Sequence, residues 1–246
     1  MEGQKGMFAM RSQVITAVAG LWVACGQTVY AQDQRTVSGT VVELYTSQGC
    51  SSCPPADAYL TKLAAEPGVI ALALHVDYWD YIGWTDKFGN AKFTARQKAY
   101  AHAAKSNTIY TPQMIVGGVD RVEGTDPAMV EGALRRHQQA SPMVALQLMR
   151  KGGQLMIVAQ ANPPLDAPLR VQLVRYHPQA SVQIEYGENA GRVLDYTNIV
   201  TSWDVLGLWD GQSDLHLQAP VDGDDPVVVI LQADGPGRIF AAAQVK

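Results

Sequence analysis

Two cysteines three positions apart, Cys50 and Cys53, are the strongest chemical signal in the sequence. The segment before them is strand-like and the segment after them is helical, so this C-x-x-C pair is predicted at a helix N-terminus. Unpaired N–H groups and the helix dipole favour a thiolate there, and lower its pKa from about 8.5 toward roughly 3.5–7.5. The spacing therefore indicates thiol–disulfide chemistry, in which Cys50, on the exposed first turn, attacks and Cys53, further into the helix, resolves the mixed disulfide.

Metal binding and an inert bridge are the alternatives for this pair. A tetrahedral zinc site needs about four ligands, but the chain has no second C-x-x-C and its five histidines are scattered. A copper site built from both cysteines and one histidine is chemically possible. A purely structural disulfide also stays open, although so short a loop gains little stability from it. We predict no metal ion and no organic cofactor.

Two further side chains are candidates for tuning the thiols. Glu43 lies in the strand before the cysteines, where a buried carboxylate could carry a proton between them. Strand alternation alone does not decide which face Glu43 occupies, so a solvent-facing glutamate is the alternative. His75 could tune the thiolate, or it could be a buried histidine that hydrogen bonds to the backbone.

The elements that must position these residues follow from hydrophobic patterning. We expect strands at 40–46, 69–76, 113–116 and 121–123, helices from the cysteines to Pro67, at 91–104 and at 126–139, and a hairpin turn at Gly117-Gly118. After Ser141-Pro142 the pattern changes to strands without helices, at 144–149, 155–160, 169–176, 182–186 and 227–232. Such a series is typical of an antiparallel sandwich, with Trp203 and Trp209 as core residues.

This order of elements resembles the thioredoxin fold. The segment 42–57 resembles more closely a secreted bacterial thioredoxin-like family, domain of unknown function 1223, as do 75–80, 110–114, 187–189 and 197–198. The resemblance implies an α/β thioredoxin-like domain at 38–140, followed by an antiparallel β-sandwich domain at 141–246. It also implies a cis Thr111-Pro112 bond, with Pro112 facing the cysteines and shaping the substrate groove. The chain departs from thioredoxin in its Ser51-Ser52 pair and in lacking a tryptophan before Cys50.

The same topology brings an aromatic loop to the cysteines. In that fold the loop after the second strand lies beside the C-x-x-C, so Tyr78 and Trp79, with Tyr81 and Trp84, could form a groove for an apolar peptide segment. Tyr110 and Thr111 would border the same groove. The alternative is that the aromatics pack the interface with the second half of the chain.

The N-terminus has the layout of a secretory signal peptide over residues 1–31. Lys5 and Arg11 precede an apolar stretch of about 11 residues, shorter than the roughly 20 of a membrane-spanning helix. Cleavage after Ala31 would leave Cys50 and Cys53 as the remaining cysteines. The alternatives are an anchor or buried first helix, and lipidation at Cys25. We expect a periplasmic or secreted protein without a membrane span.

Composition limits the remaining function classes. A hydrophobic share of 47% excludes intrinsic disorder, and a net charge of −4 offers no basic surface for nucleic acid. The expected function is that of a thiol–disulfide oxidoreductase, with protein thiols or disulfides and a redox protein as partners. The alternative is a non-catalytic thioredoxin-fold module that binds a partner or handles copper.

Overall fold

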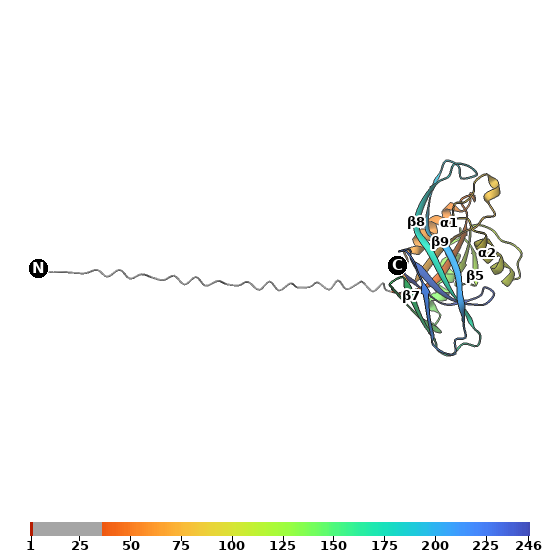
Figure 1. Ribbon diagram of the computed structural model, residues 1–246. Coiled ribbons are helices and arrows are strands. Elements are labelled where there is room, and N and C mark those ends of the chain that lie inside the picture. Colours follow the sequence, from red (N-terminus) through yellow and green to blue (C-terminus); the bar gives the residue numbers. More distant parts are fainter. Residues whose placement is uncertain (2–35) are drawn as a thin grey trace. The chain divides into compact units, whose positions relative to one another are not determined.

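The computed structural model describes Met1 and residues 36–246 (Figure 1). Apart from Met1, the predicted signal peptide over 1–31 lies outside the described residues. The helical elements of the described part are α1 (Pro54–Ala64), the 3₁₀ turn η1 (Asp80–Ile82), α2 (Ala91–Ala103) and α3 (Pro127–Gln139). The strands are β1 (Val37–Ser38), β2 (Thr40–Thr46), β3 (Val69–His75), β4 (Gln113–Val116), β5 (Asp120–Glu123), β6 (Val144–Lys151), β7 (Gln154–Ala161), β8 (Leu169–Gln183), β9 (Val193–Trp209), β10 (Leu215–Pro220), β11 (Val227–Ala233) and β12 (Ile239–Val245).

These strands form two sheets. Within residues 36–246, nine strands pair in the order β1-β12-β11-β8-β9-β3-β2-β4-β5, and three pair in the order β10-β7-β6. Strands β2 and β3 run parallel from Thr40 opposite Val69 to Thr46 opposite His75, while β4 is antiparallel to β2. The C-terminal ends of β2 and β3 and the N-terminal end of β4 therefore meet at one edge of the large sheet.

The predicted fold class, an α/β thioredoxin-like domain followed by an antiparallel β-sandwich domain, is wrong. The described chain is mostly β, and strands from both predicted parts join in one nine-stranded mixed sheet. The connection is β9, which runs parallel to β3 where Ala73 pairs with Ile199. All seven residues of β3 are buried, so this apolar strand needs a neighbour on each side, and β9 supplies the second one.

Two long strands of the second half explain why the sandwich prediction failed. The expected strands at 169–176 and 182–186 are largely one strand, β8, which pairs with β9 from Leu169 opposite Trp209 to Gln183 opposite Val193 (Figure 1). Position 141, where the domain boundary was predicted, falls between α3 and β6. The three-stranded sheet packs on β8, β11 and β12 through an apolar cluster that includes Leu146, Ile157 and Val229.

Side-chain alternation along β2 assigns its two faces. Val42 and Leu44 pack in one apolar cluster with residues of α1 and α3. Val41 and Tyr45 pack in another with residues of α2. Glu43 therefore lies on the α2 face of the sheet, because alternate side chains share a face. None of the helices in the described residues is long and apolar enough to span a membrane.

Candidate functional site

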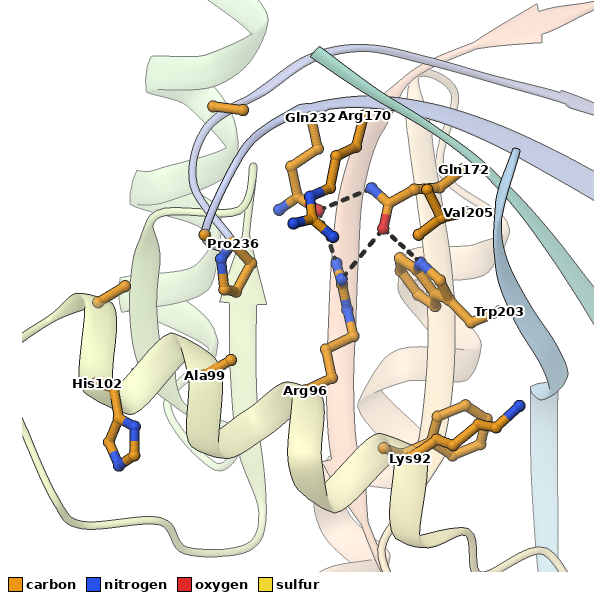
Figure 2. A pocket seen from close by; sticks show the side chains of 14 residues that line it. Lys92, Arg96, Ala99, His102, Arg170, Gln172, Trp203, Val205, Gln232 and Pro236 are labelled. Atoms are coloured by element: carbon orange, nitrogen blue, oxygen red, sulfur yellow. Dashed lines mark hydrogen bonds between the residues drawn. The ribbon is translucent and has the colours of Figure 1, made fainter. Parts of the chain in front are cut away.

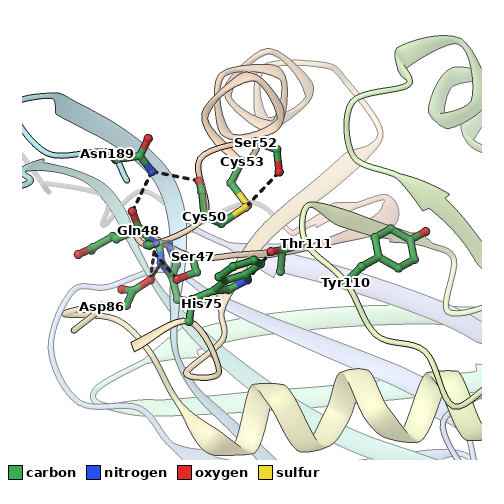
Figure 3. Close-up of a disulfide and its surroundings, with 12 residues drawn as sticks. Ser47, Gln48, Cys50, Ser52, Cys53, His75, Asp86, Tyr110, Thr111 and Asn189 are labelled. Carbon is green, nitrogen blue, oxygen red and sulfur yellow. Dashed lines mark hydrogen bonds and ion pairs between the residues drawn. A yellow bond between two sulfur atoms is a disulfide. The ribbon is translucent and has the colours of Figure 1, made fainter. Parts of the chain in front are cut away.

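A disulfide between Cys50 and Cys53 lies at the sheet edge where β2 ends (Figure 3). The Cα atoms of the two residues are 5.4 Å apart, and the residues are 1% and 0% exposed. Cys50 Sγ contacts the hydroxyl of Ser52 at 3.4 Å. Because Ser52 is exposed, the Cys50 sulfur lies beside a residue that reaches solvent.

The start of α1 differs from the prediction. Cys53 is the N-cap and the helix begins at Pro54, so Cys50 lies in the turn before the helix and is buried rather than exposed. Pro54 and Pro55 have no N–H, and the N–H groups of Ala56 and Asp57 donate to the Cys53 carbonyl. The expected free N–H donors are therefore largely absent from the described helix start, and the Ser52 hydroxyl is the local donor for a Cys50 thiolate.

The backbone just before Cys50 is fixed by buried side chains. Asp86 Oδ2 accepts hydrogen bonds from the Gln48 N–H and from His75 Nδ1, both at 2.8 Å. The Gln48 side chain accepts a bond of 2.8 Å from Trp84 Nε1. Burial alone would raise the pKa of Asp86, but the His75 ring and the N–H donors hold it below its usual value. The loop is thus anchored by an ionised carboxylate.

The second half of the chain contributes a direct contact to the cysteines. Asn189, at the tip of the β8–β9 hairpin, donates from Nδ2 to the carbonyl oxygens of Gln48 and Cys50, at 2.9 and 3.0 Å (Figure 3). Its Oδ1 accepts a bond of 2.8 Å from Arg192, and the residue is 1% exposed. The segment 187–189 carried part of the sequence resemblance, but nothing local in the sequence assigned Asn189 to the cysteine loop.

The Thr111-Pro112 peptide bond is cis, as predicted. Pro112 lies close to the first turn of α1, because a Cβ built on Gly124 would be 2.9 Å from Pro112 Cβ and 3.1 Å from Ala56 Cβ. Trp79 connects this segment to the cysteine loop: its Nε1 donates to Thr111 Oγ1 at 2.7 Å, and its Cβ lies against Gly49.

The other predicted groove residues are placed differently. Tyr78 points toward α2 and donates to Gln97 Oε1 at 3.2 Å. The Tyr110 side chain points away from the disulfide (Figure 3), while its carbonyl accepts a bond from Gln97. Trp84 stacks at a tilt on Tyr186 of the hairpin tip, with ring centroids 6.5 Å apart, and Tyr81 is 81% exposed. Trp79 and Thr111 are therefore brought to the site, whereas Trp84 packs an interface.

Glu43 is not brought to the cysteines. Its carboxylate receives two bonds from Arg96 of α2, at 2.7 and 2.8 Å, and one each from the hydroxyls of Tyr45 and Tyr100, at 2.9 and 2.6 Å. Burial alone would lower the pKa of Arg96, but the Glu43 carboxylate raises it above its usual value. The predicted proton carrier is instead half of a buried ion pair that joins β2 to α2.

Asp57 is a further candidate, which the spacing of the cysteines alone does not single out. It is 5% exposed, one helical turn after Cys53 and on the same helix face. Burial raises the pKa of Asp57 to about 7, although the neighbouring His75 acts to lower it. Among the described residues, Asp57 Oδ1, His75 Nε2 and the Tyr196 hydroxyl have no hydrogen-bond partner, whereas the Thr46 hydroxyl lies near the Asp57 carboxyl group and opposes the rise in its pKa.

These groups form one buried polar cluster. Thr46 and His75 are register partners on β2 and β3, and the His75 ring meets Tyr196 edge-on with centroids 4.8 Å apart. Burial is the main reason that the pKa of Tyr196 is raised, and the charge of Asp57 raises it further. The cluster therefore gathers the ionisable side chains of Asp57, His75 and Tyr196 in one buried group behind the cysteine loop.

Asp57 also borders a groove. A cavity of about 370 Å³ lies between α1 and the start of β9, lined by Asp57, Thr61 and Arg192 among others. The cluster behind the disulfide therefore has a route for protons toward solvent. Within the described residues, no three His, Cys, Asp or Glu side chains gather in a way that could hold a metal ion.

Comparison with known proteins places the chain in a family. It belongs to the family described as protein of unknown function, DUF1223, whose model matches residues 41–232. The match confirms the resemblance to that family and includes both cysteines, Asp57 and Asn189. The comparison with curated proteins gives no match.

Two solved structures are similar. A crystal structure of a protein from Agrobacterium tumefaciens is 31% identical, with a TM-score of 0.72 over 85% of this chain and 94% of that one. HBP35 of Porphyromonas gingivalis is 13% identical, with a TM-score of 0.58 over 85% of this chain and 74% of that one. The second likeness concerns the fold alone.

Proposed function

We propose that the chain exchanges thiols and disulfides with protein partners through Cys50 and Cys53. The observation that carries the proposal is the disulfide itself, closed within a four-residue turn at a sheet edge and backed by a buried carboxyl group with a pKa of about 7. A structural bridge has no need of a titrating group behind it. A group with a pKa close to neutral suits proton transfer near pH 7.

The exchange can be written in two balanced steps. In the reduced protein, the Cys50 thiolate attacks a partner disulfide; one partner sulfur leaves as a thiolate and a mixed disulfide forms. The Cys53 thiol then passes its proton to Asp57, and the Cys53 thiolate attacks the Cys50 sulfur. The second partner sulfur leaves, so two electrons have passed to the partner and the Cys50–Cys53 bond has formed. Oxidation of a partner dithiol follows the same steps in reverse.

Asp57 suits the proton step because of its position. Cys53 is 0% exposed, so its proton has no direct contact with water. Asp57 lies four residues further along the helix, and residues at this spacing are neighbours on one helix face. The groove beside Asp57 lets the carboxyl group return the proton to solvent.

Trapping of the mixed disulfide tests the proposal. In a Cys25→Ser background, reduced Cys53→Ser protein mixed with glutathione disulfide should accumulate a glutathione adduct on Cys50, observed by mass spectrometry. The matched Cys50→Ser variant should form the adduct far more slowly, because Cys53 is the helix N-cap behind the exposed serines. Equal and slow adduct formation in both variants would contradict an exchange function and favour a structural bridge.

We also propose that the protein is exported, because an oxidising compartment allows the disulfide to persist. The support is the signal-peptide pattern of residues 1–31. N-terminal sequencing of protein exported by a bacterial host should begin at Gln32. A lipid-modified N-terminus at Cys25 would contradict this processing.

A further inference from the structure

A second cavity lies away from the cysteines, between α2 and the strands β8, β9 and β11 (Figure 2). Its volume is about 480 Å³, within the range of roughly 300–1,000 Å³ of small-molecule sites. Its lining includes Lys92, Arg96, Arg170, Trp203, Val205 and Pro236. None of them takes part in the proposed exchange reaction.

The base of this cavity is held rigid by a polar network. Gln172 Oε1 accepts bonds from Trp203 Nε1 at 2.8 Å and from Arg96 Nη1 at 3.5 Å. Gln232 Oε1 accepts from Arg96 Nη2 at 3.1 Å and from Gln172 Nε2 at 3.0 Å. The Arg96 guanidinium also lies 3.7 Å from the centre of the Trp203 ring. A base fixed in this way loses little freedom when a ligand binds.

The charge of the cavity is positive, although the whole chain carries −4. Three cations line it, Lys92, Arg96 and Arg170, and two of these have carboxylate partners. Glu43 pairs with Arg96, and Asp234 pairs with Arg170 at an exposed position. Within the described residues, Lys92 has no carboxylate within 4.0 Å, so one positive charge is uncompensated. Figure 2 shows the Arg170 guanidinium pointing toward Arg96.

The walls of the cavity are apolar. Figure 2 shows Pro236 and Trp203 on opposite sides of Arg96. Val205 is 53% exposed beside Trp203, and Leu208 continues the exposed apolar strip on β9 at 67%. Val205 pairs with Gln172 and Leu208 pairs with Arg170 across the β8–β9 ladder, so the apolar strip adjoins the cationic residues directly.

From this arrangement we infer that the cavity binds a small monocarboxylate with a flat apolar body. The body lies along the Trp203–Val205 wall, because the Arg96 guanidinium already occupies the space between Pro236 and the Trp203 ring. The carboxylate lies against the Lys92 ammonium, which Figure 2 shows on the Trp203 side of Arg96 and pointing away from Arg170, and there the single uncompensated positive charge matches one negative charge. The flat Trp203 ring beside this position favours an aromatic body over a branched one.

Calorimetric titration with 2-naphthoate, compared with 2-naphthol, tests this inference on the full chain near neutral pH. The two probes share the naphthalene ring system, and only 2-naphthoate carries a carboxylate. We expect saturable binding of one naphthoate per chain, and binding of naphthol at least about tenfold weaker. No saturable binding of naphthoate, or equal affinity for both probes, would overturn the inference.

Two variants and one control locate the site. Lys92→Glu should weaken naphthoate binding by about tenfold or more, because it replaces an attraction by a repulsion. Val205→Asp should weaken it as well, since it places a charge on the apolar wall. Lys98→Glu makes the same charge change on the same helix, at an exposed residue outside the cavity, and should leave the affinity unchanged. Unchanged affinity in Lys92→Glu, or equal losses in Lys92→Glu and Lys98→Glu, would overturn the assignment.

Discussion

Replacement of Asp57 by asparagine should change the pH dependence of stability. The pKa of Asp57 is raised from 3.8 to about 7 in the folded protein. Between about pH 4 and pH 7 the folded state therefore binds more protons at this residue than the unfolded state does, and the free energy of unfolding falls as pH rises through this window. Asparagine does not titrate, so Asp57→Asn lacks this decline.

The size of the expected difference in stability follows from the shift in the pKa of Asp57. Each pKa unit corresponds to 1.36 kcal/mol, so a shift of about three units gives about 4 kcal/mol at most. At about pH 4 the carboxyl group is protonated in the folded protein and resembles the amide, so the variant should differ from the parent by about 1 kcal/mol or less. At about pH 8 the variant should be the more stable protein, by about 2–4 kcal/mol.

Urea unfolding of both oxidised proteins between about pH 4 and pH 8 measures this difference. Asp204→Asn is the matched control, because Asp204 is an exposed aspartate on β9; its difference from the parent should not vary with pH. If the stability difference between Asp57→Asn and the parent stays constant across the range, the carboxyl group does not titrate near neutrality. It could not then serve as the proton acceptor of Cys53.

The remaining predictions concern the residues around the site. Glu43→Gln leaves a buried guanidinium without its counter-charge, so it should lower the free energy of unfolding by about 3–5 kcal/mol in chemical denaturation while the disulfide still forms. Asn189→Ala removes two bonds to buried carbonyl groups; it should cost about 2 kcal/mol and speed reduction by dithiothreitol, whereas Glu188→Ala, at an exposed neighbour, should do neither. Ser52→Ala removes the hydroxyl donor beside the Cys50 sulfur, and should slow iodoacetamide labelling of reduced Cys50 by about fivefold at mildly acidic pH, as a raised thiol pKa requires.

The local elements of the first half follow from short-range patterns. The alternating and β-branched residues of β2 and the continuous apolar run of β3 identify both strands, and Asp126-Pro127 marks the start of α3. The adjoining Pro54 and Pro55 are residues that the first turn of a helix tolerates, and they begin α1. Their missing N–H groups, however, also take away the donors expected for Cys50.

The joining of the two halves depends on contacts far apart in the chain. The single pairing of Ala73 with Ile199 extends the large sheet, and no local pattern identifies the neighbour of β3. The ribbon of β8 and β9 includes exposed polar residues near His177 that are typical of a turn, although they pair in register. Trp203, a predicted core residue, is instead half-buried at the cavity between α2 and strands β8, β9 and β11.

The surroundings of the two carboxylates could not be predicted for a similar reason. Glu43 faces α2 because Arg96, more than fifty residues later, supplies its counter-charge. Asp57 resembles an ordinary acidic residue of a first helical turn, and its burial arises from β9 and the β3 edge packing against α1. Neither partner is near in sequence, so the side chain that titrates could not be chosen from spacing alone.

The reduction potential of the Cys50–Cys53 couple tests the exchange function most directly. The protein is equilibrated with glutathione buffers of graded potential, and the dithiol fraction is quantified by alkylation and mass spectrometry. A couple that exchanges with partners should have a potential between about −270 and −120 mV, the range of catalytic dithiols. A potential below about −300 mV, typical of structural disulfides, would contradict the proposed function.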